Sequence, residues 1–283
     1  MMMRQQMRFA IRFALPAILL VATTAVADDK PDRPRILQTP DGVRFGLLGE
    51  KAAEPAATLF VFANDIQGTL GNDSYNKVGR LLAEHGFLSV ALDLPCHGAD
   101  AKPGEPSGLD GWRARLDHGD KLVQEFVAHA ARVLDFLVHE GYTDPHRVAA
   151  CGTSRGGFIA LHFAAAEPRV KCVAAFAPVT DLLLLREFAG LPDNRQATEA
   201  LSLVNHAGQL AGRPVWICIG NHDQRVGTDS CIALTRKLVS ASVAQKRPPA
   251  VELHVTTSAG HTIHSTAHDE AAAWTLARMI PQN

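Results

Sequence analysis

The sequence has little of several features that mark particular protein classes. Its 283 residues carry a formal net charge of -1, and lysine and arginine form no dense block, so we expect no nucleic-acid partner. Glycine (22) and proline (16) are too few for collagen-like or low-complexity sequence, and 47% hydrophobic residues exclude a disordered chain. No internal repeat is present. These absences leave an ordinary globular protein, large enough to bury a sizeable core.

Long apolar runs are scarce as well, and the one near the N-terminus is short. Three arginines within the first twelve residues precede 15 uncharged residues, 13–27, which end in an A-x-A motif. This pattern is typical of a secretory signal cleaved before Asp28. The alternative, an uncleaved anchor, would need roughly 20 apolar residues. We therefore expect residues 1–27 to be a signal peptide and residues 28–283 a single exported domain, periplasmic or secreted, without membrane contact after cleavage.

Cysteine is scarce and forms no motif. The chain has five cysteines and no C-x-x-C, which indicates neither a zinc clamp nor a redox pair. Three of them lie in short apolar runs, where cysteine behaves as a small hydrophobic residue. We expect packing roles, and no cofactor, for the set Cys96, Cys151, Cys172, Cys218 and Cys231.

From about Pro34, short apolar runs alternate with longer helical patterns, which predicts an α/β fold with a mainly parallel sheet and helices on both faces. A hairpin over residues 36–48, turning at Asp41-Gly42, is expected at the sheet edge. The predicted core strands are 58–63, 88–92, 147–151, 170–176, 214–219 and 251–255. The predicted helices are 74–85, 121–140, 156–166, 228–241 and 268–280.

Two segments interrupt this alternation. Residues 95–117 are rich in glycine, proline and charge, which predicts a surface loop, and loops often carry function. Residues 181–212 form an insertion between strands with two short helical patterns. This insertion could cap a pocket or pack on the domain surface, and the sequence leaves both readings open.

The sharpest motif is G-x-S-x-G at residues 152–156, directly after an apolar strand and before a helix. Glycines two residues before and after a serine permit a tight turn that projects the hydroxyl of Ser154 at a helix N-terminus, where amide groups favour developing negative charge. A glycine-rich turn without chemistry is the alternative. A serine nucleophile also needs a base and an orienting acid further along the chain.

Asp223 and His261 have the required order and placement. Asp223 follows the predicted strand 214–219, and His261 lies between the strand 251–255 and the last helix. Because the carboxyl ends of parallel strands meet at one edge of a sheet, we expect both side chains to reach Ser154.

The spacing of His261, His264 and His268 also fits three zinc ligands on one helical face. However, Gly260 favours a loop at this point, and the H-E-x-x-H pattern of such zinc sites is missing. We expect no metal here.

Together these motifs resemble the α/β-hydrolases, specifically their prolyl-oligopeptidase and dienelactone-hydrolase-like branch. The resemblance covers most of the chain from about Thr58. It rests on GTSRGG at 152–157, APVTDL at 177–182, GNHDQRV at 220–226 and AGH at 259–261. It implies the α/β-hydrolase fold and a Ser-Asp-His triad that works through an acyl-enzyme, with Ser154 as nucleophile, Asp223 as orienting acid and His261 as general base.

The resemblance also implies an oxyanion hole made by the backbone N–H of Arg155 and of Ile66. The family often has His-Gly where this chain has Asn64-Asp65. The Asp65 carboxylate would then oppose the oxyanion, or face away and bind a substrate donor.

Four more side chains are candidates for substrate contact or for structural roles. The pair Ser154-Arg155 is similar to the Ser-Arg pair of glucuronoyl esterases, and Arg155 could bind an acidic acyl or sugar group or form a surface salt bridge. Trp112, with its neighbours Arg113 and Arg115, could face a ligand or anchor the loop.

The expected function is that of an exported serine hydrolase, acting on a small-molecule carboxylic ester or a short peptide. Prolyl oligopeptidases carry an N-terminal propeller, and too few residues precede Thr58 to form one. Dienelactone hydrolases use cysteine where this chain has Ser154. The alternatives are a serine peptidase without a propeller and a non-catalytic hydrolase-fold binding protein. Oligomeric state stays open.

Overall fold

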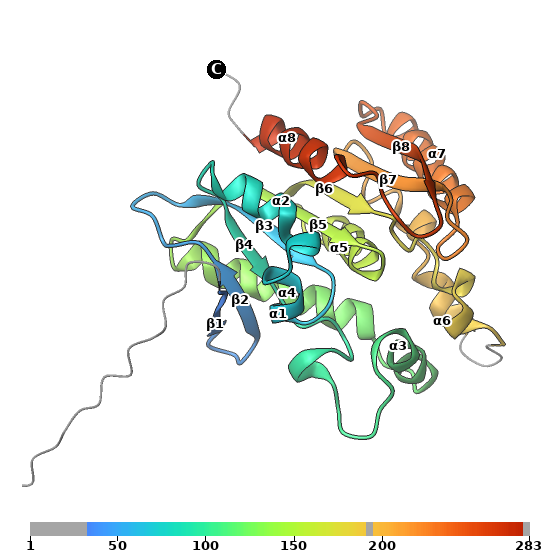
Figure 1. Cartoon of the computed structure of the whole chain (residues 1–283), viewed down its shortest axis with the longest axis horizontal. Coiled ribbons are helices and arrows are strands. Elements are labelled where there is room, and N and C mark those ends of the chain that lie inside the picture. The colour runs from blue at the N-terminus through green and yellow to red at the C-terminus, as the bar shows by residue number, and fades with distance from the viewer. Residues whose placement is uncertain (1–32, 191–194, 280–283) are drawn as a thin grey trace, which may run out of the picture. The chain divides into compact units, whose positions relative to one another are not determined.

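The computed structural model describes residues 33–190 and 195–279 (Figure 1). The predicted signal peptide, residues 1–27, lies outside the described residues. In the described part, no helix is both long and apolar enough to cross a membrane.

A mostly parallel sheet of eight strands lies at the centre of the fold (Figure 1). Its strand order is β1-β2-β4-β3-β5-β6-β7-β8, and only the pairs β1–β2 and β2–β4 are antiparallel among the pairs of these strands. The strands are β1 Arg35–Gln38, β2 Arg44–Leu48, β3 Ala56–Phe62, β4 Leu88–Ala91, β5 Thr143–Thr153, β6 Val170–Phe176, β7 Val215–His222 and β8 Val251–Ala259. The predicted α/β architecture, its six core strands and the edge hairpin are confirmed.

Helices cover both faces of this sheet (Figure 1). The α-helices are α1 Ile66–Leu70, α2 Asp73–Ala83, α3 Gly108–Asp117, α4 Leu122–His139, α5 Arg155–Ala166, α6 Arg195–Ala200, α7 Thr228–Ala244 and α8 Ala267–Met279. Single 3₁₀ turns are η1 Gly98–Asp100, η2 Leu182–Leu184, η3 Arg186–Phe188 and η4 Leu203–His206. The five predicted helices are thus confirmed as α2, α4, α5, α7 and α8.

Strand β3 illustrates why the core strands read as continuous apolar runs. All seven of its residues are buried. Phe60 and Phe62 pack in the core beneath α4, α5 and α7, whereas Leu59 and Val61 pack in the core beneath α1, α2 and α8. Successive side chains of a strand point to opposite faces, so a strand covered on both sides must be apolar throughout. Each such buried side chain contributes roughly 1.5–3 kcal/mol relative to exposure.

The predicted surface loop over residues 95–117 is partly wrong, because it ends in α3. Leu109, Trp112 and Leu116 recur at helical spacing and are buried, so packing overrides the glycine and proline signal in this segment. The short helix α1 is not among the predicted elements. Its five residues bury one turn of apolar surface through Ile66 and Leu70.

All five cysteines are buried and free. Burial raises the pKa of the thiols, to about 11 at Cys96 and Cys218 and to about 12 at Cys172 and Cys231. The predicted packing role is confirmed, because buried thiols with raised pKa values are poor nucleophiles.

Candidate active site

Ser154 lies in a sharp turn between β5 and α5. Its backbone has φ 55° and ψ -118°, which a non-glycine residue rarely adopts. Arg155 begins α5 directly after it, so Ser154 is the N-cap residue of that helix. The predicted strand–turn–helix context of the G-x-S-x-G motif is therefore present.

The two motif glycines are required by close backbone contacts. A Cβ atom on Gly152 would come within 2.3 Å of the Gly156 backbone, and one on Gly156 within 1.9 Å of the Phe62 carbonyl oxygen. No ordinary Cβ contact is that short, so any larger residue would push the turn away from β3.

Hydrogen bonds connect Ser154, His261 and Asp223 in one chain. His261 Nδ1 lies 2.8 Å from Asp223 Oδ2, and His261 Nε2 lies 2.9 Å from Ser154 Oγ. An ionised carboxylate only accepts hydrogen bonds, so Nδ1 carries the proton and Nε2 accepts the one that Ser154 donates. Ser154 and Asp223 directly follow β5 and β7, His261 lies two residues after β8, and the structure brings the three together as the sequence predicts.

Asp223 is held in place by the loop that carries it. Its side chain is fully buried, and Oδ1 accepts backbone N–H groups of Arg225 at 2.9 Å and Val226 at 3.1 Å. Thr228 Oγ1 accepts the Asp223 N–H and donates to the Gly220 carbonyl. These contacts fix the carboxylate oxygen that faces His261.

A cavity of about 370 Å³ opens beside the Ser154 hydroxyl. Its walls come from the segments that follow β3, β5, β6, β7 and β8, from the start of α5, and from α2 and α3. The lining residues are Ala63, Asn64, Tyr75, Leu109, Thr153, Ser154, Arg155, Ala177, Arg225, His261, Thr262 and Ile263. This volume suits a small ligand.

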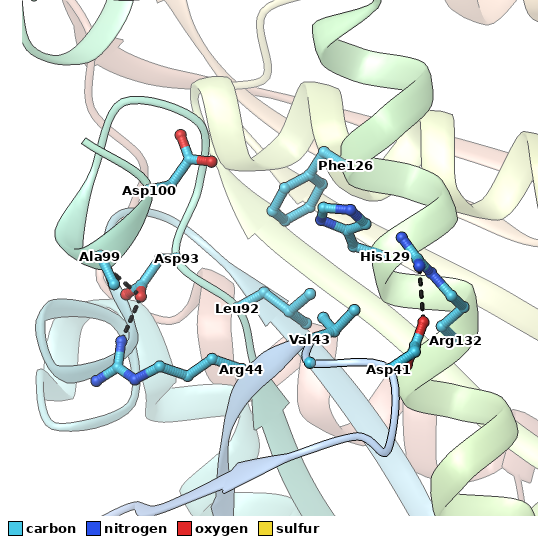
Figure 2. A pocket seen from close by; sticks show the side chains of 11 residues that line it. Asp41, Val43, Arg44, Leu92, Asp93, Ala99, Asp100, Phe126, His129 and Arg132 are labelled. Carbon is cyan, nitrogen blue, oxygen red and sulfur yellow. Dashed lines mark hydrogen bonds and ion pairs between the residues drawn. The ribbon is translucent and has the colours of Figure 1, made fainter. Parts of the chain in front are cut away.

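The Ile66 amide, predicted as an oxyanion donor, is engaged elsewhere. Ile66 N donates to Asp93 Oδ1 at 2.8 Å, so this assignment is wrong. Asp93 also accepts from Arg44 at 2.5 Å and from the Ala99 amide at 3.2 Å. Figure 2 shows the contacts of Asp93 with Arg44 and Ala99. These residues line a second hollow, separate from the cavity beside Ser154, in which Arg132 pairs with Asp41. By contrast, the Arg155 amide is the first N–H of α5, where no carbonyl of the helix can accept it.

Two predicted substrate residues do not line the cavity. Asp65 is the N-cap residue of α1 and accepts the Gly68 amide at 2.9 Å, so its carboxylate serves the helix start. Trp112 is fully buried, and its Nε1 donates to the Pro95 carbonyl at 2.7 Å. Both substrate assignments are wrong, and Trp112 anchors the loop.

The flanking arginines of α3 are structural as well. Arg115 binds Asp100 and Glu105, each at 2.6 Å, and thus closes the loop before α3. Arg113 donates to the carbonyls of Glu187 and Ala189. Neither arginine lines the cavity.

Arg155 does line the cavity. Its Nε donates to the Ala63 carbonyl at 3.2 Å and its Nη2 to Asn64 Oδ1. Burial lowers the pKa of this guanidinium, with a smaller opposing effect of Tyr75. Within residues 33–190 and 195–279 it forms no ion pair, so the surface salt bridge is wrong.

The described part of the insertion 181–212 affects the cavity indirectly, by binding a residue that lines it. No described residue of the insertion lines the cavity, while Leu182, Leu185 and Phe188 pack in the core. Glu187 binds Arg225, a lining residue, through both carboxylate oxygens at 2.7 and 2.8 Å. As described, the insertion is therefore packing rather than a cap.

The three histidines that could have formed a zinc site have separate partners. His261 belongs to the serine chain, His264 Nε2 contacts Glu270 at 3.0 Å, and the His268 ring packs on Phe176. No cluster of three or more potential ligands occurs in the described part of the chain.

Tyr75 and Arg225 line the cavity although sequence reasoning assigned neither to it. The position of Arg225 in the cavity wall could have been predicted, because Arg225 lies two residues after Asp223 in the same loop. Tyr75 had only a weak signal, a polar aromatic residue in the first turn of a predicted helix. Each contributes a hydrogen-bond donor near Ser154.

Comparisons with known proteins show the family of the chain. A model of the prolyl oligopeptidase family matches residues 111–278, which include Ser154, Asp223 and His261. The inactive dipeptidyl peptidase 10 of Mus musculus is 23% identical over 172 residues, 58% of this chain and 22% of that protein. The esterase FrsA of Escherichia coli O157:H7 is 32% identical over 113 residues, 40% of this chain and 23% of that protein.

The chain spans less than a quarter of the length of these curated relatives. Among solved structures, a cold-adapted esterase from an Arctic intertidal metagenomic library is similar to it over 88% of this chain and 94% of that one. The TM-score is 0.63 at 19% sequence identity. This likeness establishes the α/β-hydrolase fold.

Proposed function

The chain belongs to the prolyl oligopeptidase family of α/β-hydrolases, and from that premise we propose that it is a serine hydrolase that cleaves small carboxylic esters. The observation that carries the proposal is the hydrogen-bonded series Asp223–His261–Ser154 at the mouth of a cavity. Nucleophile, base and orienting acid are each within hydrogen-bond distance of the next, as acyl transfer requires.

In the proposed reaction, His261 Nε2 takes the Ser154 proton as Oγ attacks the ester carbonyl. Asp223 keeps His261 in the reactive tautomer and stabilises the imidazolium that forms. The imidazolium then protonates the leaving alcohol, and an acyl group remains on Ser154. Water, activated by His261, hydrolyses this acyl-enzyme and restores the serine.

We assign the oxyanion to two donors. The first is the Arg155 amide, at the positive end of α5. The second is the Tyr75 hydroxyl, which lines the same cavity and has no hydrogen-bond partner among the described residues. It replaces the Ile66 amide, which Asp93 already holds.

The charge of the cavity favours esters over peptides with a free N-terminus. Its described walls contain the guanidinium groups of Arg155 and Arg225 and no carboxylate. A peptide α-ammonium group needs an acidic partner once it is removed from water. Arg225 is already paired with Glu187, and the described walls offer an ammonium group no carboxylate, whereas a neutral or anionic ester needs none.

Triad variants test this function with p-nitrophenyl acetate. We expect Ser154→Ala and His261→Ala to lose about 10⁶-fold in kcat, and Asp223→Asn to lose about 10⁴-fold. Ser240→Ala and His139→Ala replace exposed residues and should retain wild-type rates. If His261→Ala kept most of the activity, the assignment of the base would be wrong.

We further propose that residues 1–27 direct export and are removed before Asp28. The support is the sequence pattern of three arginines, an apolar run and an A-x-A motif. The mass of the protein recovered from the periplasm or medium of an expressing bacterium tests this. A mass that includes residues 1–27 would contradict it.

A further inference from the structure

Arg155 differs from the other arginines around the site in having no acidic partner. Arg115 binds Asp100 and Glu105, Arg225 binds Glu187, and Arg155 binds two uncharged acceptors, Ala63 O and Asn64 Oδ1. In the described ranges no carboxylate forms an ion pair with Arg155. The acidic group that acts on it through space, Glu187, is already bound to Arg225, so no described carboxylate is dedicated to Arg155.

This charge is also largely removed from water. Burial is the main reason that the pKa of the Arg155 guanidinium is lowered; the positive charge of Arg225 acts in the same direction, and Tyr75 and Glu187 oppose it without cancelling it. Burying a cation without a counter-ion is energetically unfavourable. Unfavourable charges of this kind concentrate at functional sites, where a ligand supplies the missing partner.

The remaining donors of Arg155 are arranged for a carboxylate. A guanidinium has five N–H groups in one plane, and the contacts to Ala63 and Asn64 use Nε–H and one hydrogen on Nη2. The edge formed by Nη1 and Nη2 keeps hydrogens on both nitrogens. A carboxylate binds such an edge with two parallel hydrogen bonds.

Position and charge together define the ligand. Arg155 lines the same cavity as Ser154 and His261, so an anion that it binds lies in the cavity where the ester carbonyl reacts. Arg225 is already paired with both oxygens of Glu187, and no carboxylate lines the described walls. The cavity of about 370 Å³ leaves room for a short acyl chain.

Resting on the proposed function, we propose that the preferred substrates are esters whose short acyl group carries a free carboxylate, which Arg155 binds. In the reaction, Ser154 Oγ bonds to the ester carbon and the bond to the alkoxy oxygen breaks. His261 transfers the serine proton to that oxygen, which leaves as the alcohol. Water then cleaves the acyl-enzyme, so half-ester plus water yields alcohol plus dicarboxylate.

A matched pair of esters tests this preference. Monoethyl succinate carries the carboxylate, and ethyl succinamate replaces it by an uncharged amide of the same shape. Ethanol release gives kcat/KM for each. We expect wild type to favour monoethyl succinate at least about tenfold, as for charge-assisted hydrogen bonds. We expect Arg155→Met to bring the ratio close to one and Arg155→Lys to leave an intermediate ratio.

The ratio separates recognition from a merely structural role. Loss of the loop contacts to Ala63 and Asn64 would slow both esters alike and leave the ratio unchanged. Arg132→Met, in the separate hollow of Figure 2, removes an arginine paired with Asp41 and should keep the wild-type ratio. For wild type, added salt should reduce the preference by screening the charge.

If Arg155→Met does not fold, inhibition of the wild-type enzyme by a charged and an uncharged compound tests the proposal instead. We expect succinate to inhibit hydrolysis of ethyl succinamate at least about tenfold more strongly than succinamide does. A wild-type ratio near one, a ratio that survives in folded Arg155→Met, or equal inhibition by the two compounds would overturn the proposal while ester hydrolysis stands. Failure to hydrolyse any ester would instead contradict the proposed function.

Discussion

At the residue scale, Ser154 combines an unfavourable backbone conformation with contacts that hold it there. A non-glycine residue in a sparsely populated conformation costs about 1–3 kcal/mol. Ser154 N donates to the Phe176 carbonyl at 2.8 Å, and its own carbonyl accepts from Val179 at 3.1 Å and Phe158 at 3.2 Å. β6 and α5 therefore fix the turn before substrate arrives, and Oγ stays directed at His261.

Tyr75 gives a residue-scale prediction. Removing one donor from an oxyanion site typically lowers kcat about 100-fold or more. We expect Tyr75→Phe, which removes only the hydroxyl, to reduce kcat for p-nitrophenyl acetate by about this factor with little change in KM. Steady-state kinetics measures both values.

The chain offers a matched control, because it has only two tyrosines. Tyr142 lies away from the cavity, where Lys51 contacts its ring. Tyr142→Phe should keep the wild-type kcat. Full activity in Tyr75→Phe would remove the hydroxyl from the proposed oxyanion hole.

At the element scale, α5 is joined to the insertion 181–212 by a buried histidine. His162 Nε2 contacts the Leu201 carbonyl at 2.9 Å, and its ring packs against Phe158 and His206. Burial, with a smaller contribution from His206, lowers the pKa of His162 to about 3. His162 thus stays neutral in the folded protein, with Nε2–H as the donor.

This histidine gives a pH prediction for stability. Its pKa is lower when folded than when unfolded, so between about pH 6.5 and 3 only the unfolded chain binds the proton. Its contribution to the free energy of unfolding is present above about pH 6.5 and falls as pH drops through that window. The slope is at most about 1.4 kcal/mol per pH unit.

Urea unfolding at several pH values checks this. We expect His162→Gln to lose less stability than wild type between pH 6.5 and 4, a range within that window. His139→Gln, at an exposed site, should follow the wild-type curve. Parallel curves for wild type and His162→Gln would contradict the assignment.

Elements with strong local patterns could be predicted from the sequence, and those that depend on distant contacts could not. The core strands are apolar throughout because helices cover both faces of the sheet, so each strand can be recognised in the sequence as a continuous apolar run. α3 was not predicted, because the glycines and prolines that precede it indicate a loop. β8 runs on to Ala259 because its hydrogen bonds to β7 continue through polar residues.

The residues of the site also fall into those that local sequence predicts and those that depend on distant contacts. Ser154, Asp223 and His261 each lie within two residues of the carboxyl end of a parallel strand, so sequence order alone places them at one sheet edge. The availability of the Ile66 amide depends on Asp93, 27 residues away. The roles of Trp112 and Asp65 likewise depend on a carbonyl and a helix start that only the folded chain brings near.

At the scale of the whole molecule, net charge and local charge differ. The sequence is almost neutral at -1, yet the described walls of the cavity hold two guanidinium groups and no carboxylate. The arginines Arg44, Arg132 and Arg225 pair with Asp93, Asp41 and Glu187, the first two as Figure 2 shows, whereas Arg155 in the cavity wall forms no ion pair in the described part of the chain. A nearly neutral protein can therefore present a positive site to a substrate.

The central claim is that Ser154 is the activated nucleophile of this molecule. A fluorophosphonate probe tests it most directly, because it bonds covalently to a serine that an adjacent base activates. We predict labelling of the wild-type protein at Ser154, located by mass spectrometry of the labelled peptide, and none in Ser154→Ala. A folded wild-type protein that is not labelled, or a Ser154→Ala variant labelled as strongly as the wild type, would contradict the claim.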